Sequence, residues 1–315
     1  MRQGLTAIGL TTFDVVARPI DVLPESEATL LIDAVACAPA GTAGGSAFVA
    51  ARLGLDARLI SAVGDDLVGR FVRLALEEGG VDTALLETLP GKRTSTTILA
   101  VDSEGRRPNF HALGAGGLAR IRPEAKAAVR ASKFLHYAGV GGRHLDGGAG
   151  EALLRQARDA GVVTTCDLIS PGPSARAELE RLLPWVDYFM PSAAEARALT
   201  GLNDLREAGE TFRRMGARAC IIKNGRDGSI ALIDGGRIDT PAFAITPIDT
   251  TSCGDAFCAG FIAALDEDWP APEALRFATA TAALVAQGLA TLGRLDSFAA
   301  TRAAMLEMTC REPAP

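Results

Sequence analysis

The chain has 315 residues, of which 48% are hydrophobic and 22% charged, and its formal net charge is −6. This composition is typical of a compact soluble protein rather than a disordered one. The acidic balance, with no run of basic residues, argues against a nucleic-acid partner, and the lack of an 18-residue uncharged apolar segment argues against a membrane span.

The N-terminal stretch MRQGLTAIGLTTFD lacks the long apolar core of a signal peptide, so we expect a cytoplasmic protein. The cysteines form no C-x-x-C pair and the histidines show no metal-ligand spacing, which excludes a disulfide framework and a zinc site. Most of these side chains are therefore expected to be buried and structural: Cys37, Cys166, Cys220, Cys253, Cys258, Cys310, His111, His136 and His144.

The first part of the chain predicts a small β appendage. Segments 94–101 and 107–113 have strand character and flank the turn DSEG, which predicts an antiparallel hairpin with one exposed face. With the irregular segment 13–39, they predict an appendage made of roughly 12–40 and 92–113, inserted into a single α/β domain that spans 1–315. Such an appendage commonly serves as a lid or a dimer contact, and the alternative is an edge hairpin without a role in binding.

From about residue 130 onward, short apolar strands alternate with segments of helical period, the pattern of βαβ units in a mostly parallel sheet. The expected strands are 133–140, 161–168, 187–191 and 218–225. The expected helices between them are 148–160, 177–186, 192–201 and 207–216. The loop near Gly139 follows the first of these strands, where it would border a ligand at the sheet edge.

The stretch DTTSCGDAFCAGF, at 249–261, predicts a strand, a small-residue turn and a helix start. An apolar run at 242–248 is expected to be the strand, and Phe257 and Phe261 lie four residues apart on one helix face. A further small-residue helix is expected at 274–288, packed tightly against the first. Ligands bind beyond the carboxyl ends of parallel strands, and free amides at a helix start attract anions.

Asp255 falls in the first turn of this helix, beside the expected anion site. A carboxylate there can take the proton from an attacking hydroxyl while phosphate transfers to it. The alternative is that Asp255 only complements the helix dipole, which would stabilise by about 0.3–1 kcal/mol.

Other motifs leave alternatives open. The fingerprint-like GAGGLA at 114–119 lacks the strand before it and the acidic residue after it that dinucleotide binding needs, and no Walker-type phosphate loop occurs. Cys253 is either a quiet small residue or a reactive thiol at a helix start. Asp167 is either a turn cap or a contact to phosphate or magnesium water, and Lys223 and Arg226 either balance phosphate charge or form exposed ion pairs.

Five motifs together resemble the PfkB, or ribokinase-like, carbohydrate kinase family over nearly the whole chain. DTTSCGDAFCAGF resembles its D-T-x-G-A-G-D signature, which is the specific one. The remaining motifs resemble its glycine-rich stretch, the segment after it, its N-x-x-E segment and its nucleotide-side turn: PAGTAGGSAFVAARLG, SAVGDDLVGRFV, MPSAAEARALTG and IIKNGRDGS.

The resemblance implies a three-layer α/β/α fold with a mostly parallel central sheet and a small β lid. It implies a kinase that uses ATP and Mg²⁺ to phosphorylate a hydroxyl of a sugar or related small polyol, and it leaves a monovalent cation open. A homodimer through the lid is a further expectation. The alternatives are a nucleoside kinase of the same family and a non-catalytic sensor of nucleotide and sugar.

Site residues follow from the resemblance position by position. Asp255 matches the catalytic base, and the amides of Ser252, Cys253, Gly254 and Asp255 match the anion hole. The substrate side is matched by Asp14, Gly41, Gly44 and Gly45, together with Asp255. The nucleotide side is matched by Lys223, Gly225, Gly228, Thr250, Gly254, Thr279 and Gly293. Glu195 matches the acidic residue that organises magnesium, through water.

The chain also departs from the family pattern. Ser252 and Cys253 replace the Gly-Ala of the signature, and Ser192 replaces the Asn of the N-x-x-E segment. In the glycine-rich stretch the usual Gly-Gly is Ala40-Gly41, and Gly45 occupies the position of a sugar-contacting Asn. The substrate contacts are therefore expected to differ from those of ribokinase.

Overall fold

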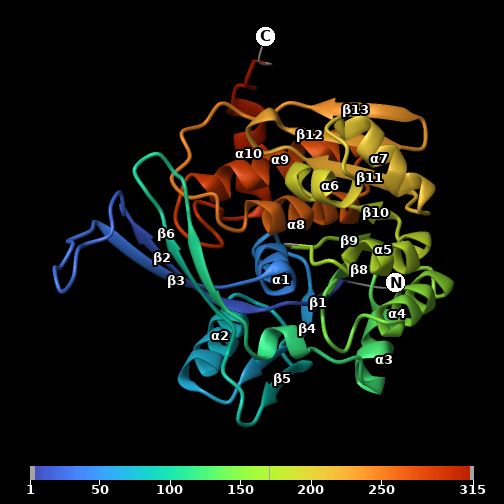
Figure 1. Cartoon of the computed structure of the whole chain (residues 1–315). Helices are drawn as coiled ribbons and strands as arrows, with labels where there is room; N and C mark the ends of the chain where they lie inside the picture. The colour runs from blue at the N-terminus through green and yellow to red at the C-terminus, as the bar shows by residue number, and fades with distance from the viewer. Residues whose placement is uncertain (1–3, 170, 313–315) are drawn as a thin grey trace.

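Two β-sheets organise the chain in the computed structural model, which describes residues 4–169 and 171–312 (Figure 1). The larger sheet has the strand order β13-β12-β11-β10-β9-β8-β1-β4-β5. Its strands pair in parallel from β5 to β11, and β12 and β13 add to one edge antiparallel. The bounds are β1 Leu5–Gly9, β4 Ala57–Gly64, β5 Leu86–Leu89, β8 Phe134–Ala138, β9 Val163–Cys166, β10 Tyr188–Phe189, β11 Ala219–Lys223, β12 Ser229–Ile233 and β13 Gly236–Thr240.

Helices cover both faces of this sheet. One apolar cluster contains side chains of α1 Thr42–Arg52, α2 Leu67–Glu78, α8 Cys253–Asp266, α9 Ala271–Ala286 and α10 Phe298–Glu307. A second cluster contains side chains of α3 Pro123–Ala131, α4 Ala149–Asp159, α5 Ala175–Leu182, α6 Ala193–Thr200 and α7 Leu205–Arg214. The predicted three-layer arrangement is confirmed. None of the helices in the described ranges is long and apolar enough to cross a membrane.

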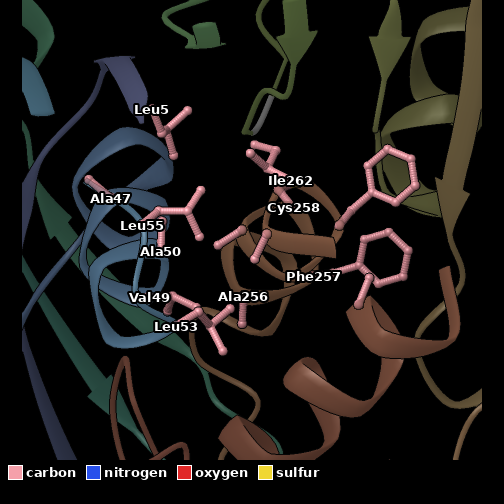
Figure 2. Packing of buried hydrophobic residues seen from close by; sticks show 14 of the residues in the cluster. Leu5, Ala47, Val49, Ala50, Leu53, Leu55, Ala256, Phe257, Cys258 and Ile262 are labelled. Carbon is pink, nitrogen blue, oxygen red and sulfur yellow. The ribbon is translucent and has the colours of Figure 1, made fainter. Parts of the chain in front are cut away.

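The helix α8 lies in the middle of the first cluster. It is apolar around most of its circumference, the pattern of a buried helix, and Phe257 and Phe261 are both buried as predicted. In Figure 2, Ala256 of α8 lies toward Val49 of α1, whereas Phe257 points to the opposite side of α8. The expected close packing against α9 is confirmed, because a Cβ at Gly260 would lie 2.5 Å from Thr281 Oγ1.

The smaller sheet projects beside the larger one (Figure 1). Its order is β3-β2-β6-β7, with the predicted antiparallel hairpin formed by β6 and β7. Along β2 the side chains of Thr12, Asp14 and Val16 are buried on one face. The bounds are β2 Thr12–Arg18, β3 Ala34–Ala40, β6 Thr96–Ala100 and β7 Asn109–Ala112.

Three expectations for the chain's secondary structure were wrong. The interval 13–39 is not irregular throughout, because it begins in β2 and ends in β3. The first hundred residues also contribute βα units to the main sheet, including β1, α1 and β4. The glycines of α1 concealed this helix in the sequence, since Gly disfavours helix, yet burial of every residue from Thr42 to Ala50 stabilises it.

The third error concerns 242–248, which forms no strand before the turn. The last strand of the sheet, β13, ends at Thr240, and the following segment has only an isolated bridge between Phe243 and Cys310. Pro241 and Pro247 lack the amide hydrogen that a strand ladder needs, so the chain reaches α8 through a segment without regular secondary structure.

The cysteines also differ in part from expectation. All six are free thiols, as predicted, but only Cys166, Cys220 and Cys258 are buried. Cys37 and Cys310 are exposed and Cys253 is half-buried. The described residues contain no cluster of three metal-ligating side chains.

The contact between α8 and α9 generates a stability prediction. We expect Gly260→Ala to lower the free energy of unfolding by about 1–3 kcal/mol, because the new methyl group overlaps Thr281 and Ala278. Urea unfolding monitored by circular dichroism measures this change. Adding Thr281→Ala removes the nearest atom and should restore part of the loss, so equal or additive losses in the double variant would contradict the packing argument.

Candidate active site

Asp249 holds the turn that leads into α8, a role that was not foreseen from the sequence. It is 1% exposed, and its Oδ1 accepts hydrogen bonds from the Thr251 amide at 2.8 Å and the Thr251 hydroxyl at 2.6 Å. Its Oδ2 accepts a bond from the Ala290 amide at 2.9 Å. Asp249 therefore closes the turn and fastens it to the segment after α9. The signal was an Asp two residues before a Thr, which is typical of a side-chain-braced turn.

Ser252 precedes α8 in a left-handed conformation, with φ 55° and ψ 11°. This is the position at which the family signature has Gly, and Gly adopts that conformation without a Cβ penalty. The backbone has therefore kept the shape that Gly allows, at a cost of roughly 1 kcal/mol for a Ser. The Ser252 side chain also lowers the pKa of the neighbouring Asp255 carboxyl.

The first-turn amides of α8 differ in availability. The Cys253 amide lies 3.4 Å from the Thr250 carbonyl, to which it donates. Gly254 and Asp255 contribute the next amides, which have no partner within a helix by geometry. The Cys253 side chain turns away toward the Ala282 carbonyl at 3.6 Å, and burial raises its pKa to about 12. It is the quiet small residue of the two alternatives.

Asp255 faces the glycine-rich start of α1. A Cβ at Gly45 would lie 2.9 Å from Asp255 Oδ2, so a side chain at this position would displace the carboxylate. The Ser46 hydroxyl donates to the Asp255 carbonyl oxygen at 3.4 Å. The structure therefore joins two predicted site residues, Gly45 and Asp255, that are more than two hundred residues apart in sequence.

The surroundings of Asp255 make it a weaker acid than usual. Its pKa rises to about 7, first because the carboxyl is buried and then because the Asp167 carboxylate lies nearby. The Lys223 ammonium and the Ser252 hydroxyl act in the opposite direction, and Asp14 raises the pKa further. A group of this kind exchanges protons near neutral pH, which suits a general base.

The predicted substrate-side residues have different roles. Asp14 is 6% exposed on β2 and accepts a hydrogen bond from the Thr12 hydroxyl at 2.8 Å. Burial raises its pKa, while Thr12, Thr97 and nearby cationic side chains lower it. Gly41 begins α1 with φ 88°, where a Cβ would lie 2.7 Å from the Leu10 carbonyl. A Cβ at Gly44 would instead meet the Thr11 side chain at 2.9 Å, which indicates a packing role.

Glu195 and Ser192 form a capping box at the start of α6. The Glu195 amide donates to Ser192 Oγ at 3.2 Å, and the Ser192 amide donates to Glu195 Oε2 at 2.7 Å. Ser is as good an N-cap as the Asn it replaces, so this departure keeps the helix start intact. Burial raises the pKa of Glu195, and Asp167 adds to the rise.

Lys223 is not an exposed ion-pairing residue, which corrects the default expectation. Its side chain is 11% exposed, and Nζ lies 2.6 Å from Oδ2 of Asp167, whose side chain is 3% exposed. A Cβ at Gly254 would lie 3.4 Å from Lys223 Nζ. The ammonium group therefore lies directly against the backbone that begins α8.

Gly225 and Gly228 form the turn between β11 and β12, both with positive φ. A Cβ at Gly225 would meet nothing within 4 Å, so this side of the turn is open, whereas Gly228 packs against the Thr240 carbonyl. Thr250 accepts a hydrogen bond from Arg107 Nε at 2.8 Å. Arg107 lies just before β7 and was not predicted as a site residue. It connects the small sheet to the turn before α8.

The remaining two nucleotide-side predictions occupy structural positions. The Thr279 hydroxyl donates to the Leu275 carbonyl at 2.8 Å within α9, and the residue is 7% exposed. Gly293 has φ 49°, and a Cβ there would lie 2.0 Å from the Val285 carbonyl. These contacts of Thr279 and Gly293 lie within α9 and behind it, so the part of the two residues in nucleotide binding stays a prediction.

Comparisons with known proteins give the family. Residues 2–294 match the model of the pfkB family carbohydrate kinases. An ATP-dependent ribose-1-phosphate kinase from Halopiger xanaduensis is 31% identical, covering 93% of this chain and 95% of that protein. A fructokinase from Klebsiella pneumoniae is 30% identical, covering 78% of this chain and 81% of that protein.

Solved structures agree on the fold. A protein from E. coli, described as a ribokinase II in complex with ATP and Mg²⁺, superimposes with a TM-score of 0.83 at 20% identity, covering 97% of this chain and 99% of that chain. This structural match covers almost the whole chain, including both sheets, and so does the match to the family model. The two matches together identify the family. The protein belongs to the pfkB family of carbohydrate kinases.

Proposed function

We propose that this carbohydrate kinase transfers the γ-phosphoryl group of ATP to a hydroxyl of a sugar or related small polyol, with Asp255 as general base. The observation that carries the proposal is the place of Asp255, between the substrate-side glycine Gly45 and the first amides of α8. An acceptor hydroxyl beside Gly45 gives its proton to Asp255 as its oxygen attacks phosphorus. The amides of Ser252, Cys253, Gly254 and Asp255 face the charge of the transferring group.

The acceptor is held from the side of the small sheet. The Asp14 carboxylate accepts hydrogen bonds from sugar hydroxyls, and Gly45 leaves the space beside Asp255 free of a side chain, while Gly41 and Gly44 let the start of α1 pack closely against Leu10 and Thr11 on the substrate side. The segments 12–40 and 92–113 act as a lid within a single domain, and Arg107 marks where that lid reaches the turn before α8. Closure excludes water, which would otherwise accept the phosphoryl group.

The nucleotide lies along the other side of α8. Lys223 carries positive charge to the phosphates, and the open turn at Gly225 and Gly228 receives the adenosine part, with Thr250, Thr279, Gly254 and Gly293 along the same path. Bound Mg²⁺ neutralises phosphate charge. Glu195 fits a magnesium ion held through water, because Mg²⁺ keeps most of its waters and needs only one or two carboxylates beside the phosphates.

A monovalent cation is an optional activator of the reaction. The proposed compartment is the cytoplasm, which supplies ATP and keeps free thiols reduced.

Asp255→Asn tests the assignment. We expect kcat to fall by about 10²–10⁴-fold, since the amide cannot accept the hydroxyl proton. ADP release, measured over sugars, sugar acids, polyols and nucleosides, identifies the acceptor and the loss together. The variant should unfold at an equal or higher temperature than the wild type at pH 8, because it buries no charge.

Other outcomes of that screen contradict the proposal. Equal turnover by Asp255→Asn would remove Asp255 as the base, and a clear preference for nucleosides would replace the sugar acceptor. Binding of ATP and a sugar by thermal shift, without turnover of any acceptor, would identify a sensor instead.

The acidic limb of the pH profile follows from the pKa of about 7 for Asp255. The base must be ionised, so kcat/KM should be level above this pH and fall about tenfold per unit below it. Initial rates between pH 5 and 9 measure the limb, with MgATP binding checked at each pH by calorimetry. A limb near pH 4 would mean that Asp255 is exposed to water in the working enzyme.

The outer face of the small sheet is the proposed homodimer contact. Val35, Ile98 and Phe110 are 60%, 50% and 59% exposed on this face. Sedimentation should give twice the chain mass for the wild type and a single chain mass for Ile98→Glu with Phe110→Glu. Leu306→Glu, a matched change of a 67% exposed residue on α10, should leave the dimer intact. A wild-type monomer, or a dimer that both sets of variants leave unchanged, contradicts the contact.

A further inference from the structure

A buried charge cluster lies behind the proposed transfer site, formed by Asp167 at the end of β9, Lys223 at the end of β11 and Cys258 on α8. Lys223 Nζ is 2.6 Å from Asp167 Oδ2 and 3.5 Å from Cys258 Sγ. Cys258 Sγ lies 3.3 Å from the same carboxylate oxygen, to which it donates. The described structure thus places one buried cation and one buried anion side by side next to the first turn of α8.

The carboxylate of Asp167 is fully engaged. Its Oδ1 accepts a hydrogen bond from the Leu168 amide at 2.9 Å, while Oδ2 accepts from Lys223 and Cys258. The Lys223 ammonium has three donors: one bonds to Asp167 Oδ2 and a second points to Cys258 Sγ at 3.5 Å. The group also lies 3.4 Å from the Cβ position of Gly254, on the side where the amides of α8 begin. Asp167 therefore fixes where the ammonium charge lies relative to these amides.

A structural role alone does not account for this pair. Burying two charges costs several kcal/mol of solvation for each ion, and well-packed apolar residues of similar volume are often equally or more stabilising. What apolar residues do not supply is an electric field on neighbouring groups. The neighbours here are the two carboxylates of the proposed site, Asp255 and Glu195, and both feel Asp167 and Lys223 with opposite signs.

We propose that Asp167 is a positioning residue: it holds the Lys223 ammonium against the start of α8, and the two charges together set the proton affinity of Asp255. This inference rests on the proposed function of Asp255 as the base. The sequence left two roles open for Asp167, a turn cap or a contact to phosphate or magnesium water. The proposed role modifies the second one, since the carboxylate acts on the phosphate side through Lys223 and does not touch phosphate itself.

The charged groups that face Asp255 come from several elements. Asp167 on β9 and Asp14 on β2 raise its pKa, and Lys223 on β11 lowers it. On its own helix, Cys258 is a neutral thiol, because burial raises its pKa well above the usual range. Behind the cluster His136 is also neutral, because burial lowers its pKa to about 4. Removing one member of the Asp167–Lys223 pair therefore leaves its partner's charge uncompensated.

The signs of the expected shifts are opposite. Asp167→Asn removes a negative charge and leaves the ammonium, so the ionised form of Asp255 is favoured and the acidic limb moves to lower pH. Lys223→Met removes the positive charge and leaves Asp167, so the limb moves to higher pH. Each shift should be about one unit, the lower end of what a nearby charge produces. The double variant, which has neither charge, should return the limb close to its wild-type position.

The double variant also tests the ammonium itself. On the plateau of the pH profile, the kcat of the double variant should stay at least about tenfold below that of the wild type, since the positive charge that stabilises the transferring group is absent. Because Asn and Met bury no charge, this variant is the one expected to fold even where a single variant does not. A wild-type plateau in the folded double variant would overturn the proposal.

A ligand-free measurement separates this proposal from the proposed function. Carboxyl ¹³C titration by NMR, with the Asp255 signal identified by its loss in Asp255→Asn, follows the proton directly in each variant. Opposite shifts of this signal support the proposal even where Asp255→Asn shows that the base lies elsewhere. Shifts of the same sign, or no shift in folded single variants, would overturn it.

The matched control is the Lys133–Asp266 ion pair at the far end of α8. Lys133 Nζ lies 2.8 Å from Oδ1 of Asp266, at the last residue of the helix, and both side chains are about one-third exposed. Lys133→Met and Asp266→Asn change the same kinds of charge, but Asp266 lies about 16 Å along the helix from Asp255. They should leave the limb and the Asp255 titration in place. A shift in these variants as large as in the Asp167 and Lys223 variants would show a general charge effect and overturn the positioning role.

Discussion

A partly buried carboxylate at the first turn of an apolar helix is the constraint on which the proposed site depends. Burial of Asp255 opposes its ionised form, and the same burial raises its pKa to about 7 and makes it useful as a base. Keeping the group there requires a rigid frame. The braces are Asp249, which holds the turn, the close contact of Gly260 with Thr281, and Gly45, which leaves room for the carboxylate. Each brace acts on the position of the helix start rather than on the chemistry itself.

The departures from the family signature are tolerated for different physical reasons. Ser192 keeps the one property that its position needs, a side-chain acceptor for the Glu195 amide. Ser252 instead occupies a left-handed position that favours Gly, at a cost of roughly 1 kcal/mol. Cys253 turns its sulfur toward the Ala282 carbonyl, which leaves the phosphate side lined by backbone.

Local patterns were enough to predict the later βα units, the hairpin of β6 and β7 and the helix after the turn. They failed where burial overrides propensity, as in the glycine-rich α1, and where prolines interrupt an apolar run, as in 242–248. Only the site residues that belong to a family signature motif could be predicted from the sequence. Lys223 and Asp167 are 56 residues apart and meet because β10 alone separates their strands. Arg107 and Thr250 are 143 residues apart in the sequence, and no local sequence pattern predicts their contact.

The charge balance at the carboxyl ends of β9 to β11 explains why the ion pair lies where it does. Asp14, Asp167, Glu195 and Asp255 place several carboxylates around a site that must also receive the phosphates of ATP. Helix amides supply only partial positive charge, equivalent to about half an elementary charge at a helix start. Lys223 supplies a whole charge, and its pairing with Asp167 raises its pKa, so it stays protonated although burial opposes this. In the proposed mechanism, Lys223 supplies this charge from a position that Asp167 already fixes, so less of its side chain has to be ordered during the reaction.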